Sequence, residues 1–275
     1  MKCTGCKTKF YTLQSVFNAL GFCRNKVATK NRHKKSTCWG RQNSLYGAMF
    51  YAGPVHIAIA MDGNRRWAKK NNFPLFYGHR RGVHAVSEVT KMALDRKIPH
   101  LTFFAFSTEN WKRSGDEIAY LMRLFSRSID RYRTFLLREG ICVRFIGDLA
   151  PLDPDLLGKI SSIRERTRHN EKLFLTIAIN YGSRDEVIRA VKKMSIGELK
   201  NCSWETFRRH LDSADLPDVD LFIRTSGEQR LSNFLLLQSA YAELIFVPKN
   251  WPEFTAEDFE SALQEFGRRK RNFGK

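Results

Sequence analysis

Short apolar runs alternate along the chain with longer stretches in which apolar residues recur every three or four positions. Short runs bounded by polar residues predict buried strands, and the longer periodic stretches predict amphipathic helices. We expect strands at 55–61, 101–106, 142–146, 173–180, 221–224 and 244–247. We expect helices near 80–96, 115–138, 154–169, 184–195, 203–211 and 255–271.

This alternation is typical of a parallel sheet with helices on both faces. Asp116 and Glu117 would lie in the first turn of the second helix, where carboxylates favour the positive end of the helix dipole. Pro154 is suited to the first turn of the third helix. Residues 49–275 contain no internal repeat. The sequence therefore predicts a single α/β domain over 49–275, with about six mainly parallel strands flanked by helices.

The first 48 residues differ in composition from the rest. Residues 1–61 hold ten Lys or Arg and no Asp or Glu, although the whole chain carries a net charge of +19. No compact apolar segment typical of a secretory signal is present. This composition predicts an organelle transit peptide over 1–48, for a plastid or a mitochondrion, with a cytoplasmic or endoplasmic-reticulum location as the weaker prediction. A disordered basic arm that binds acidic surfaces or nucleic acid is the alternative.

Four of the six cysteines lie in this basic segment. Cys3 and Cys6 form a single CxxC pair, and a second pair at zinc-site spacing is missing, so no zinc site is predicted. Cys142 and Cys202 fit the pattern of small apolar residues. No apolar run approaches 18 residues, and a membrane-spanning helix is therefore not expected.

Polar clusters follow three of the expected strands. Asp62-Gly63-Asn64-Arg65-Arg66-Trp67 follows the first, residues 107–113 follow the second, and residues 224–232 follow the fifth. Ligands of open α/β sheets bind beyond the carboxyl ends of the strands. Because parallel strands end at the same edge, we expect these clusters to meet there.

The side chains in these clusters suit a diphosphate. Guanidinium groups make paired hydrogen bonds to phosphate oxygens, and hydroxyl groups add neutral donors. The candidates are Arg66, Arg113, Arg224, Arg230, Ser107 and Ser232. Asp62 and Glu243 are hard oxygen ligands of the kind that Mg²⁺ takes together with substrate phosphates. Neither a Walker loop nor a GxGxxG motif is present, so a nucleotide-kinase frame is not indicated.

Aromatic residues are frequent in and around the expected strands, among them Phe103, Phe104, Phe106 and Phe125. Core packing explains such residues in most proteins. Here they also allow an apolar tunnel that leads away from the diphosphate site, with its far end near Ile146, Leu173 and the helix at 115–138.

Five ordered motifs resemble the cis-prenyltransferases, the undecaprenyl and dehydrodolichyl diphosphate synthase family. They lie at 56–68, 78–79, 105–111, 180–182 and 223–244, and the resemblance covers about 54–275. The stretch Ser226-Gly227-Glu228-Gln229-Arg230 is similar to plant members, in agreement with a plastid location. The resemblance implies a Mg²⁺-dependent condensation of isopentenyl diphosphate with an allylic diphosphate, which forms a cis double bond.

The resemblance also implies roles for individual residues. Asp62 would hold Mg²⁺ together with Glu243, and Asn110 would assist proton removal. The allylic diphosphate would contact Gly63, Asn64, Arg65, Arg66, Trp67 and His79. Ser107, Thr108, Glu109, Trp111 and Arg113 would lie near the reacting carbons. The diphosphate of isopentenyl diphosphate would contact Arg224, Arg230, Leu231 and Ser232. A homodimer or a hetero-subunit assembly is expected, with peripheral membrane contact through the product and no nucleic-acid partner.

The chain departs from the family pattern at three points. No basic residue stands at or beside Leu75, where bacterial members often have Arg, and Gln229 replaces a histidine. Asn272 occupies the position of an arginine that reaches across the dimer in the family. Either Arg271 takes this role with a shift in register, or the contact across the dimer is weakened, and the second case would favour dependence on a partner subunit. One alternative is therefore a non-catalytic or partner-dependent subunit of a two-chain synthase. Two others are a trans-type prenyl synthase and a nucleic-acid-binding protein, which the pI of 9.9 suggests.

Overall fold

The computed structural model describes residues 53–271, and every structural statement below concerns this range. The basic segment 1–48, with Cys3 and Cys6, lies outside the described residues, as does Asn272. The transit peptide, the domain boundary at 48/49 and the plastid location therefore stay predictions. Among the helices within 53–271, none combines the length and apolar character that crossing a bilayer requires.

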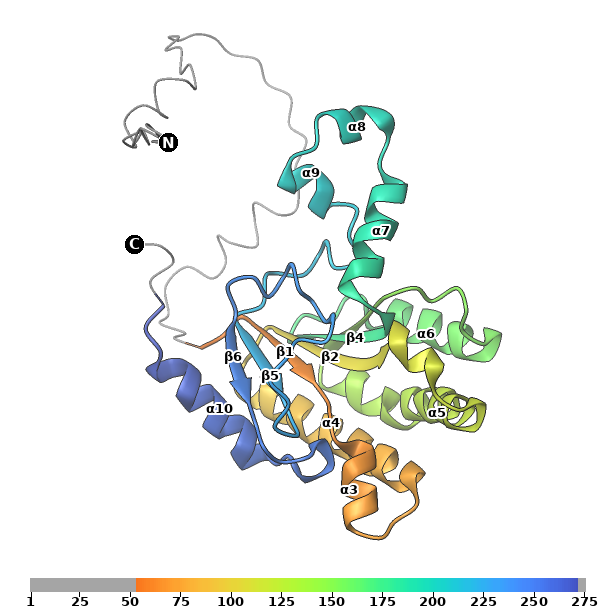
Figure 1. The fold of residues 1–275 in the computed structure, drawn as a ribbon, viewed down its shortest axis with the longest axis vertical. Helices are drawn as coiled ribbons and strands as arrows, with labels where there is room; N and C mark the ends of the chain where they lie inside the picture. The colour runs from red at the N-terminus through yellow and green to blue at the C-terminus, as the bar shows by residue number, and fades with distance from the viewer. Residues whose placement is uncertain (1–52, 272–275) are drawn as a thin grey trace, which may run out of the picture. The chain divides into compact units, whose positions relative to one another are not determined.

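Six strands form one sheet in the order β3-β4-β2-β1-β5-β6, and every neighbouring pair is parallel (Figure 1). The strands are β1 (His56–Ala60), β2 (His100–Ser107), β3 (Ile141–Ile146), β4 (Leu173–Tyr181), β5 (Leu221–Arg224) and β6 (Glu243–Phe246). The predicted six-stranded parallel sheet is confirmed, with β6 beginning one residue earlier than expected.

Helices precede, connect and follow the later strands, and most of the longer ones were predicted from the sequence pattern. They are α3 (Asn64–Lys70), α4 (Leu75–Asp95), α5 (Gly115–Arg138), α6 (Pro154–Thr167), α7 (Ser183–Lys193), α8 (Ile196–Lys200), α9 (Trp204–Arg208) and α10 (Ala256–Arg268), with 3₁₀ turns η1 (Thr108–Lys112) and η2 (Trp251–Glu253). The short helices α3 and α8 were not expected. Helices of five to seven residues give too few turns for an apolar period to show.

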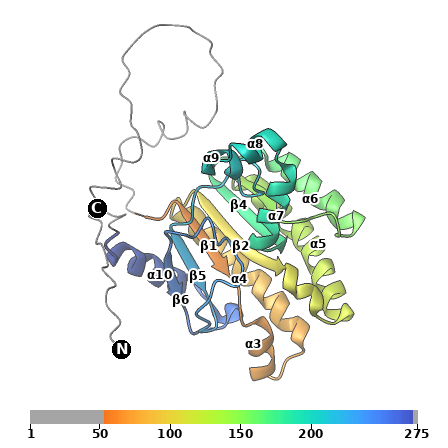
Figure 2. The same cartoon turned by 45° about the horizontal axis from the view of Figure 1, so that its top comes forward.

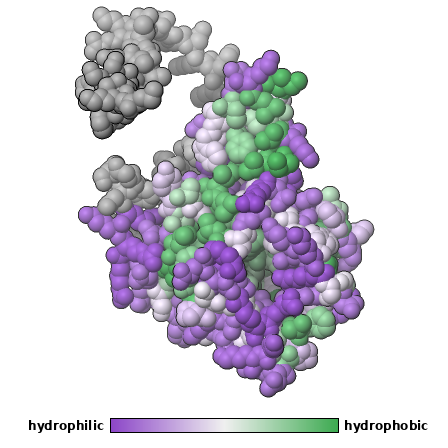
Figure 3. Space-filling view, viewed as in Figure 1, coloured by the Kyte–Doolittle hydropathy of each residue, from purple (hydrophilic) through white to green (hydrophobic). Residues whose placement is uncertain are grey.

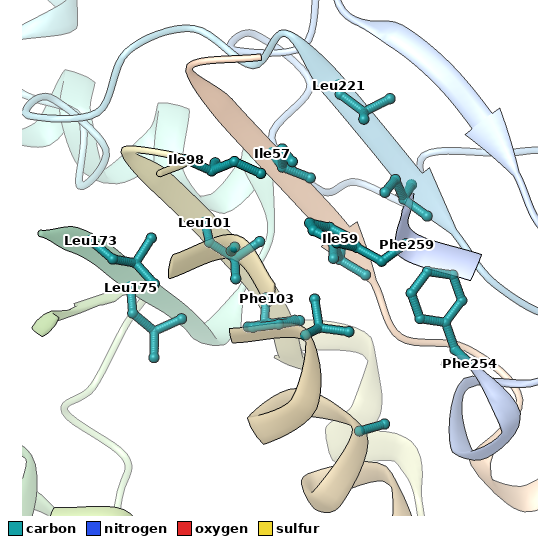
Figure 4. Packing of buried hydrophobic residues seen from close by; sticks show 14 of the residues in the cluster. Ile57, Ile59, Ile98, Leu101, Phe103, Leu173, Leu175, Leu221, Phe254 and Phe259 are labelled. Carbon is teal, nitrogen blue, oxygen red and sulfur yellow. The ribbon is translucent and has the colours of Figure 1, made fainter. Parts of the chain in front are cut away.

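The core lies on both faces of the central strand β1, all of whose residues are buried. Successive side chains of a strand point to opposite faces. Ile57 and Ile59 therefore join the cluster formed with α4 and α10, which Figure 4 shows next to Phe103 and Phe259. Ala58 and Ala60 face the other cluster, which is closed mainly by loop residues. Burial of a large apolar side chain contributes roughly 1.5–3 kcal/mol, which anchors the sheet edge that carries the polar clusters.

Helices α7, α8 and α9 rise together from one side of the sheet (Figures 1 and 2). Their surface shows a group of apolar residues (Figure 3). The large exposed apolar side chains of this segment are Ile188, Val191, Ile196, Leu199 and Trp204. Exposed apolar patches on folded proteins commonly mark surfaces that bind a partner.

Candidate active site

The ends of β1 and β5 lie side by side. Ala60 pairs with Arg224 in the sheet, and Asp62 follows two residues after Ala60. Thr225 fixes the turn, because its hydroxyl donates to the Asp62 carbonyl at 2.8 Å and accepts from the Asp62 N–H at 2.9 Å. The predicted meeting of the first and fifth strand ends is therefore seen directly. The role of Thr225 was missed, since it follows only from the strand register.

Asp62 is held between two guanidinium groups. Its Oδ2 accepts from Arg224 Nη2 at 2.9 Å, and its Oδ1 accepts from Arg66 Nη2 at 2.9 Å and from the Gly63 N–H at 2.7 Å. Burial alone would raise the pKa of this carboxyl. The hydrogen bonds and charges of Arg224 and Arg66 outweigh burial and hold the pKa below its ordinary 3.8. Asp62 is therefore an ionised oxygen ligand at neutral pH.

Gly63 allows the chain to turn from β1 into α3 at close quarters. Its φ of 97° lies in the left-handed region that side chains other than glycine rarely adopt. A Cβ at this position would also collide with the side chains of Asn250 and Ser226, which are hydrogen-bonded to each other at 2.8 Å. The glycine in the first motif is thus required by local geometry.

Arg224 organises the loop that follows β5. Only 5% of the residue is exposed, and its Nη1 donates to the Arg230 carbonyl at 2.6 Å and to Ser232 Oγ at 2.7 Å. Its buried Nε has no hydrogen-bond partner within the described part of the chain. Arg224 therefore fixes the positions of Asp62, Arg230 and Ser232 relative to one another.

Glu228 links the other two arginines. Arg66 Nη1 donates to Glu228 Oε1 at 2.6 Å, and Arg230 Nη1 donates to Glu228 Oε2. The side chains of Arg66 and Arg230 are 48% and 58% exposed, so both can be reached from solvent. Hydrogen bonds from Arg230 and Arg66 lower the pKa of Glu228. Glu228 lies within the motif at 226–230, but its pairing with two arginines was not predicted, because ion pairs between loops leave no pattern along the chain.

The loop after β5 has an unusual backbone. Positive φ angles occur at Ser226, Gly227, Ser232, Asn233 and Leu235. A residue other than glycine held in this region costs roughly 1–3 kcal/mol, and such strain gathers at functional sites. The loop is therefore shaped for something other than its own stability.

Hydrogen bonds from the start of α7 hold this loop in place. Ser183 donates its N–H to the Asn233 carbonyl at 2.7 Å and accepts from the Leu236 N–H at 2.8 Å. Beneath it, buried Glu186 accepts from the Tyr181 hydroxyl at 2.6 Å and from Gln238. The motif at 180–182 thus supports the site through α7, a role that the sequence alone did not reveal.

A second charged cluster surrounds Glu117 at the start of α5. This carboxylate is 6% exposed, and Arg113 donates to it at 3.0 Å, while Arg65 and His79 lie 3.7 and 3.4 Å away. Burial, with help from the Arg113 charge, lowers the pKa of His79, so the imidazole is neutral at pH 7. Glu117, which was expected only to favour the helix dipole, instead brings three predicted site residues together.

The turn after β2 is built from the predicted substrate-binding residues. The Asn110 Oδ1 accepts from the Ser107 N–H at 3.1 Å. Trp111 Nε1 donates to Asn180 Oδ1 at 2.7 Å, and Thr108 Oγ1 donates to Asp185 at 3.0 Å. The side-chain oxygen that Asn110 would need to accept a proton is therefore engaged in shaping the turn.

Three further predicted residues contact neighbouring segments, and of these Leu231 and Trp67 are half-buried while Glu109 is exposed. Leu231 packs against the apolar cluster on the loop side of the sheet. Glu109 accepts from Asn233 at 3.2 Å, which ties the β2 turn to the loop after β5. Trp67 stacks on Phe73 and Tyr77, with ring centroids 5.6 and 6.0 Å away.

An apolar cavity of about 170 Å³ begins at this site. Asn64, His79 and Trp251 line its mouth, and side chains of α4, α5, β2 and β4 form its walls. The expected apolar space beneath the site is present as this cavity. Its lining also includes Thr90, Leu136, Val143, Ile163 and Leu175, and because Val143 and Leu175 lie near the beginnings of β3 and β4, we assign these residues to its far end.

Two residues expected at the far end do not line the cavity. Ile146 faces the cluster on the other side of the sheet. Leu173 packs in the same core as the tunnel walls but is not among the lining residues. The sequence pattern placed both in buried strands, but it did not give the face or depth of each side chain.

The structure does not bring Glu243 to Asp62. Glu243 begins β6 and pairs with Leu221, whereas Arg224 at the other end of β5 is the residue that reaches Asp62. Instead, Glu243 accepts from Arg269 Nη1 at 3.0 Å. Strands rise about 3.3 Å per residue, and Glu243 is level with Leu221, three residues before Arg224. This acid therefore lies roughly 10 Å from Arg224 toward the amino-terminal ends of the strands. The expected pair of metal ligands is therefore not formed within one chain.

Asp62, even without Glu243, suits a magnesium ion that binds together with the substrate phosphates. Among residues 53–271 no group of three or more His, Cys, Asp or Glu side chains could hold a metal by itself. Mg²⁺ commonly takes one or two carboxylates and completes its shell with water and phosphate oxygens. Ionised Asp62 beside three arginines fits that arrangement.

Comparisons with known proteins agree with this geometry. A family model described as "Putative undecaprenyl diphosphate synthase" matches residues 60–274. An isoprenyl transferase of Thermotoga maritima is 47% identical, with 80% of this chain and 97% of the relative covered. An isoprenyl transferase of Agrobacterium fabrum is also 47% identical, over 80% of this chain and 92% of the relative.

Two solved structures share the fold. Lavandulyl diphosphate synthase from Lavandula x intermedia, in complex with dimethylallyl diphosphate, superposes with a TM-score of 0.78 at 31% identity. The match covers 82% of this chain and 99% of that one. A probable undecaprenyl diphosphate synthase from Campylobacter jejuni gives a TM-score of 0.68 at 36% identity, over 81% and 99% of the two chains.

Proposed function

Because this chain belongs to the cis-prenyltransferase family of undecaprenyl diphosphate synthases, we propose that it condenses isopentenyl diphosphate with an allylic diphosphate primer. The product is a Z-configured prenyl diphosphate of short to medium length. One observation carries the proposal: an ionised acid, bonded to Arg66 and Arg224, stands between Met61 and Asn64 in the chain, and those two residues line an apolar cavity. This arrangement suits a substrate with a diphosphate head and a hydrocarbon tail.

The residues around Asp62 would bind and activate the primer. Arg66 offers donors to the allylic diphosphate, Gly63 lets the backbone approach it without a side chain, and Asp62 would hold Mg²⁺. When bound, Mg²⁺ neutralises the charge that develops on the pyrophosphate leaving group. Arg66 adds fixed positive charge at the same place, which favours breaking of the carbon–oxygen bond.

Arg230 and Ser232 would hold isopentenyl diphosphate on the other side of Asp62. Arg224 orients both, through its bonds to the Arg230 carbonyl and to Ser232 Oγ. The double bond of isopentenyl diphosphate attacks the primer carbon, so that a new carbon–carbon bond forms as the primer's carbon–oxygen bond breaks and pyrophosphate is released. The proton lost from isopentenyl diphosphate would pass to an oxygen of that pyrophosphate. Apolar walls at the cavity mouth keep water from the cationic carbon. The growing tail then occupies the cavity, where each buried CH₂ contributes about 0.8 kcal/mol.

Turnover of radiolabelled isopentenyl diphosphate, with Mg²⁺ and allylic primers of increasing length, tests the proposal. Asp62→Ala should lower the rate by about 100-fold or more, because Mg²⁺ would lose its carboxylate ligand and the pyrophosphate leaving group would lose the positive charge that Mg²⁺ supplies. Asp130→Ala removes an exposed acid on α5 and should leave the rate unchanged. Parent protein that gives no extended product with any primer would exclude the function, and mass analysis of dephosphorylated products gives the chain length.

We further propose that the enzyme is a homodimer. The exposed apolar side chains of α7–α9 support association with a second copy of the chain. Sedimentation of the parent and of Ile196→Asp at equal concentration tests this, since Ile196 is 75% exposed and its replacement should not disturb the core. A monomeric parent would contradict the proposal. The complete Asp62–Arg224–Arg230 network argues against the alternative of a non-catalytic subunit.

A further inference from the structure

A second concavity lies between α4 and α5, which pack side by side (Figure 2). This α4–α5 groove has a volume of about 730 Å³. Its basic lining residues are Arg80, Arg81, Lys91, Arg123, Arg127 and Arg131. Glu88 is the one acid among the residues that line it. The groove is therefore strongly positive and lies apart from the charged site around Asp62.

The basic side chains along α5 form a regular row. Arg123, Arg127 and Arg131 are exposed and recur every four residues, which places them on one face of the helix. Within residues 53–271, neither these arginines nor Lys91 forms an ion pair. Like charges at this spacing destabilise a helix slightly. An unpaired row of this kind is complementary to an extended anionic surface.

The wall of the groove is also the wall of the apolar tunnel. Val83, Leu124, Tyr132 and Phe135 line both. One layer of side chains therefore separates the cavity proposed for the prenyl tail from the outside of α4 and α5.

Exposed apolar residues border one end of the groove. Phe73, Leu75 and Phe76 are 44%, 40% and 40% exposed where α4 begins. The Phe76 ring lies 4.4 Å from the ring of Tyr120, which lines the groove. Basic residues beside exposed aromatic and aliphatic ones are typical of surfaces that lie in the headgroup layer of a membrane.

We propose that the α4–α5 groove docks the chain on an anionic lipid bilayer. The arginines contact the phosphate headgroups, while Phe73, Leu75 and Phe76 enter the interfacial layer. Docking in this orientation brings the thin tunnel wall against the bilayer, where the hydrocarbon tail of the product is soluble. The transfer of product rests on the proposed function, but the docking does not.

Flotation of the full chain with phosphatidylcholine vesicles, with and without phosphatidylglycerol, tests the docking. The triple variant Arg123→Glu, Arg127→Glu, Arg131→Glu should lower the partition coefficient onto anionic vesicles by about tenfold or more. The matched control Arg133→Glu, Arg164→Glu, Arg166→Glu makes the same charge change at exposed positions outside the groove and should lower it less than about twofold. Both variants keep residues 1–52, so lipid binding by that segment is common to them.

Three results would overturn the docking proposal. The two triple variants could lose equal affinity, the parent could fail to bind anionic vesicles, or the groove variant could keep vesicle binding while losing affinity for polyuridylate. The last result would assign the groove to nucleic acid. Turnover of the groove variant in detergent should match that of the parent, which shows that it is folded. Asp62→Ala should bind vesicles like the parent, so a failure of the proposed function is distinguished from a failure of docking.

Discussion

The three arginines around Asp62 differ in their surroundings. Arg224 is buried and makes hydrogen bonds to Asp62, to the Arg230 carbonyl and to Ser232. Arg66 and Arg230 are about half exposed. A charged group whose donors are engaged inside the protein shapes a site, whereas an exposed guanidinium group can exchange its partner for a ligand. Arg224 is therefore a positioning residue, and Arg66 and Arg230 are the candidates for direct contact with diphosphate.

Arg230→Ala should raise the apparent KM for isopentenyl diphosphate by about 10-fold or more and change the KM for the primer by less than about twofold. The reason is that Arg230 follows β5, whereas the primer site follows β1. Initial rates with each substrate varied in turn measure both constants. Arg224→Ala should raise the KM for isopentenyl diphosphate and also disturb the primer site, because Arg224 bonds Asp62 as well, and it should unfold at lower denaturant concentration. Equal changes in both KM values for Arg230→Ala would contradict the assignment of the two diphosphate sites.

Part of this site could be predicted from single residues. Asp62, Arg66, Arg224, Arg230 and Ser232 follow strands, and parallel strands end at one edge, so their meeting follows from the pattern. Glu243 was placed wrongly beside Asp62 because its position along β6 depends on strand register. The parts played by Glu228 and Glu117 were not foreseen, since they depend on contacts between segments far apart in the sequence.

At the level of elements, α4, α5 and the sheet together enclose the tunnel. The apolar periodicity of α5 predicted the helix and its buried side. Which of its residues reach the cavity was not predictable, because this depends on the packing of α5 against β3 and β4. Leu136 lies at the far end of the cavity, whereas Leu173 lies in the same core without lining it.

Leu136→Ala should lengthen the longest product, because it removes a buried side chain from the far end of the cavity. Leu173→Ala is the matched control and should leave product length unchanged. Both changes should lower the free energy of unfolding by roughly 2–5 kcal/mol. Mass analysis of dephosphorylated products measures length, and urea denaturation measures stability. A longer product from Leu173→Ala, or an unchanged one from Leu136→Ala, would refute the assignment of the far end.

His56 and His100 join His79 in being held neutral by their surroundings, and of the two His56 is fully buried and His100 partly buried. His56 bonds through Nδ1 to the Pro217 carbonyl and through Nε2 to Thr102 Oγ1, both at 2.8 Å. Burial lowers its pKa to about 4. Burial, together with the nearby His56, lowers the pKa of His100 to about 3. The unfolded chain binds protons at these histidines near pH 6.5, before the folded chain does, so the stability of the whole domain depends on pH.

The free energy of unfolding should fall as the pH drops from 7 toward 4, with a slope that approaches about 1.4 kcal/mol per pH unit for each histidine. His100→Phe should remove the part of this slope that His100 contributes, since a phenyl ring cannot take a proton and His100 already stacks on Phe174. The exposed His169→Gln is the control. Urea denaturation at several pH values measures the slope, and identical slopes for parent and His100→Phe would contradict this account.

Glu228 has one more consequence for how the protein handles its ligands. Its carboxylate already accepts a hydrogen bond from both Arg66 and Arg230, so an incoming anion competes with it for the donors of these two arginines. A diphosphate would therefore bind by replacing Glu228 as the hydrogen-bond partner of these two arginines. This competition lowers the affinity of the site for every anion, and it would speed the release of pyrophosphate between successive condensation steps.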